Sequence, residues 1–158
     1  MRLTEPLGFS LLELIIVIII IAVLVVAGAP RLLTGSNYAS YTQQQDIIAE
    51  LRRVQQLAMN NRDRCYRTTF TGTSYRSQHL DTSCSTIIVN DPIIDIDSSV
   101  QVTLLPSNAQ SFDVYFDFFG RSSFNSSQDG VCQPSCIQIS GVDQLAVSVS
   151  SEGYIYAP

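Results

Sequence analysis

The pattern of hydrophobic and polar positions divides the chain into three parts. Residues 9–35 are almost uniformly apolar, and residues 36–62 repeat apolar positions at steps of three and four, as on one face of a helix. Residues 63–158 form short segments in which apolar and polar positions alternate, which is typical of β-strands. We therefore expect an α+β protein in which a long N-terminal helix precedes a β-rich globular head.

The apolar run predicts a transmembrane helix. A helix from Phe9 to Ala29 would be about 30 Å long, which matches the hydrocarbon core of a bilayer. Glu13 is the only carboxylate in the run, and an ionised acid at the centre of such a helix costs roughly 2.5 to 3.5 kcal/mol. We therefore expect Glu13 to have a partner and a function.

The end of the apolar run is predicted to kink. Pro30 has no N–H to donate to the carbonyl of Val26, and Gly28 lowers helix propensity by roughly 1 kcal/mol relative to alanine. A kink or a melted stretch is therefore expected in residues 26–35, with a bent helix as the alternative.

The amphipathic part carries one apolar stripe, which is formed by Ile47, Ile48, Leu51, Val54 and Ala58. We expect this stripe to cover the β-sheet of the head, so that residues 9 to about 60 form one long, broken helix. A partner-binding face is the alternative. The strands are expected at 65–71, 74–78, 87–89, 100–104, 112–118, 137–139, 145–149 and 153–156.

The N-terminal residues resemble the class III signal of type IV pilins and type II secretion pseudopilins. In this chain the signal consists of Gly8 and Phe9, the hydroxyl residue Ser10, and Glu13. The resemblance implies that a prepilin peptidase cleaves between Gly8 and Phe9, removes residues 1–8 as a leader, and N-methylates Phe9. It also implies that Glu13 meets the new Phe9 ammonium of a neighbouring subunit, so that charge neutralisation and polymerisation become one event.

Two other interpretations of the N-terminus stay open. A removable secretory signal would be cleaved after residues 27–29, although Pro30 would then follow the cut and Glu13 would interrupt the apolar core. A plain membrane anchor is the other interpretation.

The C-terminal half is similar to that of the GspH/FimT group of minor pilins and pseudopilins. The similar segments are 116–121, 136–139, 145–149 and 152–155, and Phe118 stands where the group often has proline. The two resemblances imply the type IV pilin fold, with a kinked N-terminal helix packed on an antiparallel β-sheet. They also imply three kinds of partner: other pilin or pseudopilin subunits, the prepilin peptidase, and an inner-membrane assembly platform.

We predict from these resemblances a non-enzymatic minor pilin that primes or caps a type IV pilus. A pilus of the mannose-sensitive haemagglutinin type is one setting, and adhesion at the tip is one role. The protein would start in the inner membrane with its head in the periplasm and would then join the filament at the cell surface. A minor pseudopilin of type II secretion is the alternative function.

Arg121 raises a third possibility, because a basic turn at this place is implicated in DNA capture by FimT-like relatives. Here Ser122 and Ser123 follow it, so a second arginine is absent. The chain has nine basic and fourteen acidic residues and a formal charge of −5, whereas a phosphate backbone calls for a concentrated basic surface. Nucleic acid is therefore an unfavoured partner.

Charge is unevenly distributed along the head. Six arginines lie between residues 52 and 76, whereas residues 81–152 contain nine acids and Arg121 as their only base. Complementary contacts between neighbouring heads in a filament are one use of this polarity, and solvated faces are the alternative.

Four cysteines in an exported head predict two disulfides, because the periplasm is oxidising. Four cysteines allow three pairings. The short loop between Cys132 and Cys136 favours their pairing, which leaves Cys65 to join Cys84. A four-cysteine zinc site is the alternative, although neither pair has the usual two-residue spacing.

Catalytic and cofactor chemistry has little support in the sequence, so we expect no enzyme activity, no cofactor and no metal. His79 is the only histidine, and we place it in a surface loop. Asp91, Asp95 and Asp97 are candidate calcium ligands, but residues 94–97 also fit a strand whose acids face water.

Overall fold

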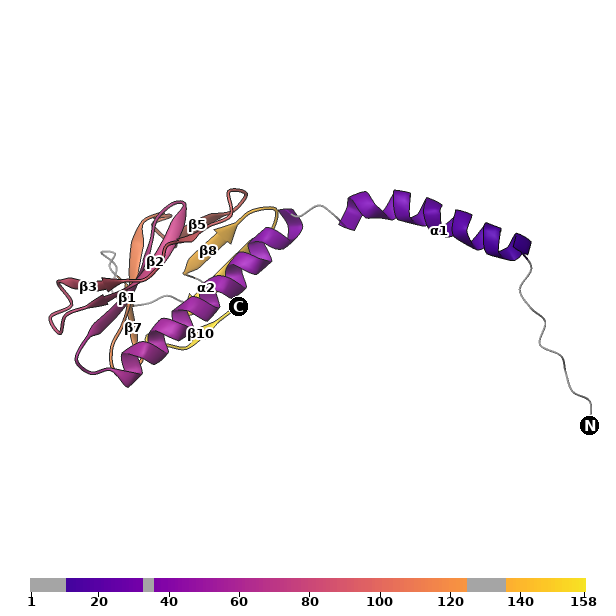
Figure 1. Cartoon of the computed structure of the whole chain (residues 1–158). Coiled ribbons are helices and arrows are strands. Elements are labelled where there is room, and N and C mark those ends of the chain that lie inside the picture. Colours follow the sequence, from indigo (N-terminus) through magenta and orange to yellow (C-terminus); the bar gives the residue numbers. More distant parts are fainter. Residues whose placement is uncertain (1–10, 33–35, 125–135) are drawn as a thin grey trace, which may run out of the picture. The chain divides into compact units, whose positions relative to one another are not determined.

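The computed structural model describes residues 11–32, 36–124 and 136–158, which form two helices and ten strands (Figure 1). The helices are α1 (Leu11–Leu32) and α2 (Ser36–Asn60). The strands are β1 (Cys65–Phe70), β2 (Ser74–Leu80), β3 (Ile87–Asn90), β4 (Ile94–Asp95), β5 (Gln101–Leu104), β6 (Phe112–Phe116), β7 (Ser122–Phe124), β8 (Ile137–Ser140), β9 (Gln144–Val149) and β10 (Ile155–Tyr156). The chain divides into two compact units, Met1–Gly35 and Ser36–Pro158.

The first unit contains α1, a helix of 22 residues with Glu13 in its first turn. An acid at this place interacts favourably with the positive end of the helix dipole. The helix continues through Gly28 and Pro30 to Leu32, so it does not break at the proline itself. Residues 33–35 lie outside the described part, and the kink stays a prediction.

Among the described residues, no helix combines the length and the apolar character that a membrane span requires.

The second unit begins with α2, whose apolar stripe is buried as predicted. The fully or almost fully buried side chains of the stripe are Ile47, Ile48, Leu51, Val54 and Ala58. The helix ends at Asn60, close to the expected end of the long helix, although the amphipathic pattern extends to residue 62. There the backbone N–H and the side-chain amide of Asn61 both donate to the carbonyl of Leu57, at 3.1 and 3.0 Å. These bonds satisfy a carbonyl that the helix end leaves without an intrahelical donor.

The strands form two antiparallel sheets, where the sequence had predicted one. The first has the order β3-β2-β1-β6-β7, with β4 also paired to β2, and the second has the order β10-β9-β8-β5. Every named strand pair is antiparallel. The α+β class and the packing of a helix on antiparallel strands are therefore confirmed, and the division into two sheets is new.

One hydrophobic core joins α2 to both sheets. In β1 the residues Tyr66, Thr68 and Phe70 are buried and their neighbours are partly exposed, as the period of two requires. The Phe70 ring stacks on Phe112 of β6 and on Tyr75 of β2, with centroids 4.6 and 5.4 Å apart. All buried residues of this core lie in Ser36–Pro158.

Two predicted strands are shortened by glycine turns. Strand β6 ends at Phe116 because Asp117–Gly120 forms a turn, and Gly120 has φ +81°. Strand β10 begins only at Ile155 because Gly153, at φ +87°, belongs to the preceding turn. Glycine adopts this left-handed conformation without the steric cost that a Cβ brings.

Candidate functional site

The predicted processing and assembly residues lie at the N-terminus. Gly8 and Phe9 are outside the described residues, and Glu13 is an exposed residue of α1. Their roles in cleavage, methylation and assembly therefore stay predictions.

The two glycine turns meet at one side chain of α2. The Gln55 amide donates from Nε2 to the carbonyl of Gly120 at 2.8 Å and to the carbonyl of Gly153 at 2.6 Å. A Cβ on Gly153 would lie 1.7 Å from the Gly120 oxygen. Gln55 therefore holds the two turns together.

Two further side chains of α2 bind the backbone of the second sheet. The Gln44 amide donates to the carbonyl of Ala146 at 2.7 Å, and the Arg52 guanidinium donates to the carbonyl of Ile155 at 2.8 Å. Sequence reasoning missed these contacts, because a polar residue beside an apolar stripe carries no local sign of a long-range partner.

A second polar cluster joins α2 to the first sheet. Arg53 forms two 2.8 Å bonds with the Glu50 carboxylate and also donates to Asp91. Burial raises the pKa of Glu50, but hydrogen bonds from Arg53 and from the Ser77 hydroxyl lower it by more, so the pKa lies below its usual value. The half-buried Glu50 carboxylate is therefore charged and paired at neutral pH.

The prediction that His79 lies in a surface loop is wrong. Strand β2 continues to Leu80, so His79 is a strand residue whose ring lies 4.8 Å from that of Tyr66. Its Nε2 is 3.4 Å from the Asp91 carboxylate. The sequence of this strand gives little sign that it continues, because Ser77, Gln78 and His79 are all polar.

The candidate calcium ligands do not converge. Asp91 pairs with Arg53, Asp95 is an exposed residue of β4, and Asp97 accepts bonds from the backbone and hydroxyl of Ser99 at 2.8 and 2.6 Å. These bonds from Ser99 lower the pKa of Asp97. In residues 11–32, 36–124 and 136–158 no cluster of three or more His, Cys, Asp or Glu side chains could hold a metal ion.

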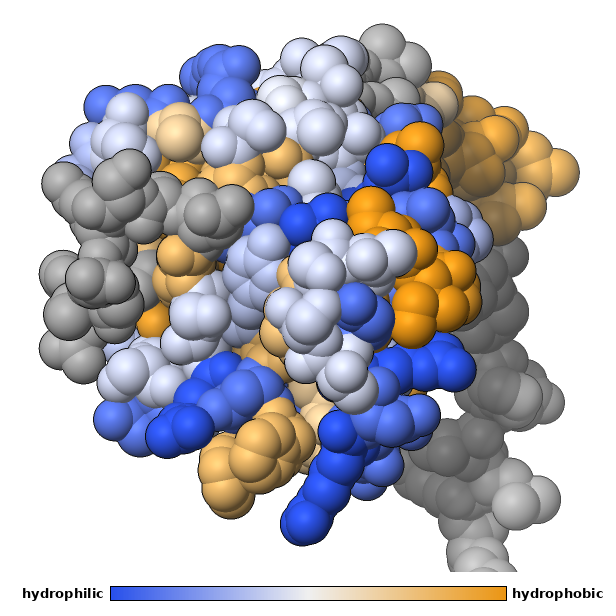
Figure 2. Space-filling view, turned by 90° about the vertical axis from the view of Figure 1, so that its left-hand side faces the viewer, coloured by the Kyte–Doolittle hydropathy of each residue, from blue (hydrophilic) through white to orange (hydrophobic). Residues whose placement is uncertain are grey.

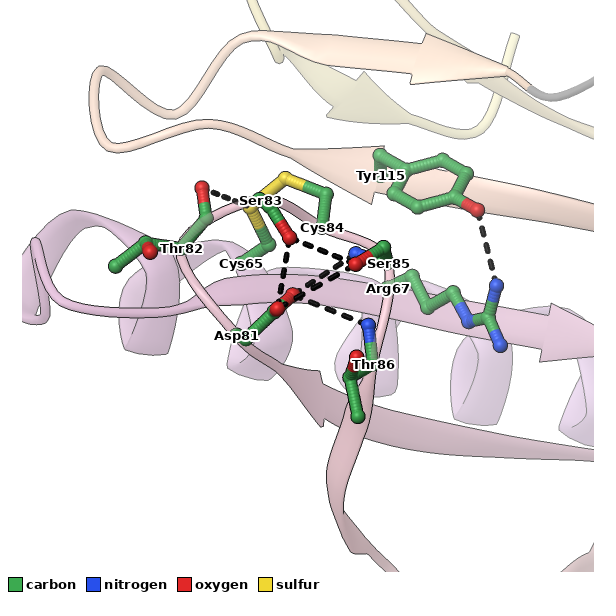
Figure 3. Close-up of a disulfide and its surroundings, with 9 residues drawn as sticks. All are labelled: Cys65, Arg67, Asp81, Thr82, Ser83, Cys84, Ser85, Thr86 and Tyr115. Carbon is green, nitrogen blue, oxygen red and sulfur yellow. Dashed lines mark hydrogen bonds between the residues drawn. A yellow bond between two sulfur atoms is a disulfide. The ribbon is translucent and has the colours of Figure 1, made fainter.

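Cys65 and Cys84 form a disulfide, as predicted, with their Cα atoms 5.2 Å apart (Figure 3). The loop that carries Cys84 is organised by Asp81, whose carboxylate accepts bonds from Ser83, Ser85 and Thr86. Hydrogen bonds from Ser83 first, then from the backbones of Thr86 and Ser85, lower the pKa of Asp81 to about 2. Asp81 is therefore ionised at neutral pH and holds the loop.

The disulfide rules out the alternative in which all four cysteines bind zinc. Cys132 lies outside the described residues, so its pairing with Cys136 stays a prediction.

Loss of the Cys65–Cys84 disulfide is expected to destabilise the head. The two cysteines are 19 residues apart, and closing a loop of this size contributes about 3 kcal/mol. Urea unfolding of Cys65→Ala/Cys84→Ala should show this loss. The same double variant in reducing buffer is the control. A double variant that unfolds at the same urea concentration as the wild-type head would contradict the assignment of the disulfide.

A groove of about 490 Å³ lies beside the disulfide, at the end of the first sheet where α2 ends. Arg62 and Arg64 line it together with Tyr115 and Phe118. The Arg62 guanidinium lies 6.0 Å from the centroid of the Phe118 ring. Figure 2 looks at the left-hand end of Figure 1, where hydrophobic and hydrophilic patches lie side by side. We call the groove lined by Arg62, Arg64, Tyr115 and Phe118 the distal groove.

Arg121 does not offer an unpaired charge. Its Nε and Nη2 both lie 2.7 Å from Oδ2 of Asp117, and its backbone N–H donates to Oδ1 at 2.9 Å. Burial raises the pKa of Asp117, but the bonds from Arg121 and from the Phe119 N–H lower it by more, so the pKa lies below its usual value. The residue considered for DNA contact is therefore an exposed side chain that forms an ion pair within its own turn.

The fold is similar to that of solved pilin structures. A crystal structure of the type IV minor pilin FimU from Pseudomonas aeruginosa matches with a TM-score of 0.50 and 13% identity, over 78% of this chain and 91% of that one. The chain has a type IV pilin fold. A second crystal form of FimU matches over 75% of this chain and 91% of that one, with a TM-score of 0.47 and 14% identity.

At this level of identity the likeness carries the pilin fold and no functional assignment. No protein-family profile matches the chain, and no characterised sequence does.

Proposed function

We propose that the protein is a minor pilin, a structural subunit that primes or caps the assembly of a type IV pilus. The observation that carries the proposal is the combination of a type IV pilin fold with Glu13 in the first turn of α1 and with Gly8 and Phe9 a few residues before it in the sequence. A prepilin peptidase would cleave between Gly8 and Phe9 and methylate the new N-terminus. The protein itself performs no catalysis in this proposal.

Glu13 would drive assembly through its charge. After cleavage the Phe9 ammonium lies about one helical turn from Glu13 along the chain. Two unit charges 4 Å apart attract by about 4 kcal/mol at an effective dielectric constant of 20, and by more in a drier environment. When the ammonium of one subunit meets Glu13 of the next, both charges are neutralised, and the stems stack in register.

The proposed location follows from the two units of the chain. The apolar helix would sit in the inner membrane, where it meets the peptidase and the assembly platform, and would later enter the filament core. The Cys65–Cys84 disulfide supports a periplasmic head, because disulfides persist in oxidising compartments. A capping role would place the protein at the tip of the pilus, where it could take part in adhesion. The pilus could be of the mannose-sensitive haemagglutinin type.

A type II secretion pseudopilin of the GspH kind is the alternative, since the same signal and a similar head would serve both machines. Neighbouring genes for pilus biogenesis rather than secretion components would favour the pilus. A DNA-binding role is the second alternative, and the Arg121 that it would use forms an ion pair with Asp117.

Mass spectrometry of the intact protein from membranes tests the proposal. We expect a chain that begins at methylated Phe9. Gly8→Val is the control, because a branched side chain beside the cleaved bond should obstruct the peptidase and leave residues 1–8 attached. A wild-type chain that begins at Met1 or at Pro30 would overturn the proposal.

A further inference from the structure

We infer that the distal groove binds an acidic sugar, that is, a sugar ring that carries a carboxylate beside its hydroxyl groups. This role deepens the proposed function and rests on it for its biological use, because a subunit at the tip of a pilus would meet the polysaccharides of other surfaces. Binding of the sugar is a property of the head alone, so it can be measured without a filament.

The distal groove has the size and the place of a small-ligand site. Its volume of about 490 Å³ falls within the range of about 300 to 1,000 Å³ that is usual for such sites. Cys65 and Tyr115 line it from β1 and β6, and both alternate with buried residues of the core, so they belong to the opposite face of the first sheet. Figure 3 shows the disulfide and the Tyr115 ring on this side of β1.

Two arginines give the groove a positive charge. Arg62 has no ion-pair partner among the described residues, and Arg64 lies 3.9 Å from Asp63, whose side chain is 75% exposed. Such an exposed pair contributes little. Asp117 also lines the groove, but its carboxylate is bound by Arg121. Both guanidiniums are therefore available to a carboxylate, which this group can bind through two parallel hydrogen bonds.

Two aromatic side chains form apolar walls. Phe118 is 47% exposed, and its ring packs on that of Phe119 with the centroids 4.1 Å apart. The Tyr115 hydroxyl accepts a hydrogen bond from Arg67 at 3.0 Å, and the same guanidinium lies 5.8 Å from the centroid of the Tyr115 ring. Both rings are thus held before a ligand arrives, which reduces the cost of binding. The C–H groups on one face of a sugar ring suit such a wall.

Two hydroxyl residues complete the lining, Thr82 on the loop after β2 and Ser123 on β7. Within the described part of the chain neither hydroxyl forms a hydrogen bond. Hydroxyl groups donate and accept hydrogen bonds, so those of a sugar can pair with them. A simple carboxylate would use only the arginines, whereas an acidic sugar uses the arginines, the rings and the hydroxyls together.

An acidic peptide fits the groove less well. A peptide also brings backbone N–H and C=O groups, which need partners when they are buried. The strands β1 and β6, which line the groove, are interior strands of the sheet and are paired on both sides. Their backbone groups are therefore not available to a peptide, and the chemistry of the lining favours the sugar.

The head Ser36–Pro158 is a suitable object for the test, because it contains the whole hydrophobic core and forms a compact unit. The probes are the methyl glycosides of glucuronic, galacturonic and N-acetylneuraminic acid, titrated into the head and followed by NMR. We expect saturable binding of at least one of them, with shifts at Arg62, Arg64, Tyr115 and Phe118. No saturable binding of any of these acids would overturn the inference.

Simpler compounds separate the parts of the ligand. Neutral methyl glucoside and methyl galactoside lack the carboxylate, and acetate has only the carboxylate. Each should bind at least about tenfold more weakly than the acidic sugar, because each loses one set of contacts. Acetate that binds as tightly as the sugar would reduce the groove to an anion site. Tighter binding of a capped acidic tripeptide would assign the groove to a protein partner, and either result would overturn the inference.

Substitutions in the groove separate charge from stacking. Arg62→Gln/Arg64→Gln should weaken binding of the acidic sugar at least about tenfold, whereas Arg76→Gln, at an arginine of β2 that does not line the groove, should leave it almost unchanged. Phe118→Ala should also weaken binding, with Tyr154→Ala as its control, since Tyr154 is an exposed aromatic residue outside the groove. None of these residues belongs to the core, and the NMR spectra report directly whether each head is folded. Equal losses in the groove variants and in their controls would overturn the inference.

The outcome is independent of the test of the proposed function. N-terminal processing is measured on the full chain, and sugar binding is measured on the head. A head that binds no acidic sugar leaves the pilin proposal standing. A chain that is not cleaved after Gly8 removes the setting at the pilus tip but leaves the affinity of the groove measurable.

Discussion

Replacing Gly153 by alanine is expected to destabilise the head by about 3 to 5 kcal/mol, which is the range of the most severe single substitutions. Gly153 has φ +87°, where an L residue is strained, and the new Cβ would lie 1.7 Å from the Gly120 carbonyl oxygen and 2.4 Å from the Gln55 amide nitrogen. The first contact is with backbone, so the two turns would have to separate. Their separation would also break the Gln55 bonds.

Urea unfolding of the head measures this effect. Gly72→Ala is the matched control, since its new Cβ would meet only the side chain of Gln110, whose oxygen would lie 3.0 Å away. Gln110 is exposed and can move, so we expect a change within about 0.5 kcal/mol, as for most surface substitutions. Equal stability of the Gly153→Ala and Gly72→Ala heads would contradict the close approach of the two turns.

Replacing Glu13 by valine is expected to abolish filament assembly while leaving the processed N-terminus unchanged. Valine suits an apolar helix, so insertion in the membrane should persist. The Phe9 ammonium of the neighbouring subunit, however, would enter the filament core without a counter-charge. An unpaired buried charge costs several kcal/mol.

Two measurements on the same strain check this result: mass spectrometry of the N-terminus and the amount of protein in sheared filaments. Glu13→Gln is the matched control for shape, because it keeps the length and polarity of the side chain and removes only the charge. Both variants should fail to assemble. Normal piliation of a strain that carries either Glu13 variant would contradict the proposal that charge neutralisation drives assembly.

Local patterns predicted the elements well, because the positions that repeat are the ones that become buried. The stripe of α2 is the helical face that packs on the sheets, and the alternation of Phe112, Val114 and Phe116 is the inward face of β6. The pairing of Cys65 with Cys84 was also predictable, since the loop between the other two cysteines is short.

Long-range polar contacts could not be predicted. Gln55 and Arg53 look like solvated residues of an amphipathic helix, yet one clamps two turns and the other binds an acid 38 residues away. Asp117 becomes the partner of Arg121 because it lies in a turn, where its carboxylate accepts the backbone N–H of Arg121. The sequence pattern instead extended the strand to Phe118 and so placed Asp117 within it. These partners come together only when the helix packs on the two sheets. The sequence of a single segment therefore shows no periodic pattern that would predict them.

The contacts of α2 have a mechanical consequence. Gln44 and Arg52 attach the helix to β9 and β10, and Gln55 attaches it to the two glycine turns, at points spread over about three helical turns. Tension along α2 would therefore load these attachments in parallel, in shear, and would not peel the strands away one at a time. We therefore expect the head to resist pulling through α2 until several of these bonds break together.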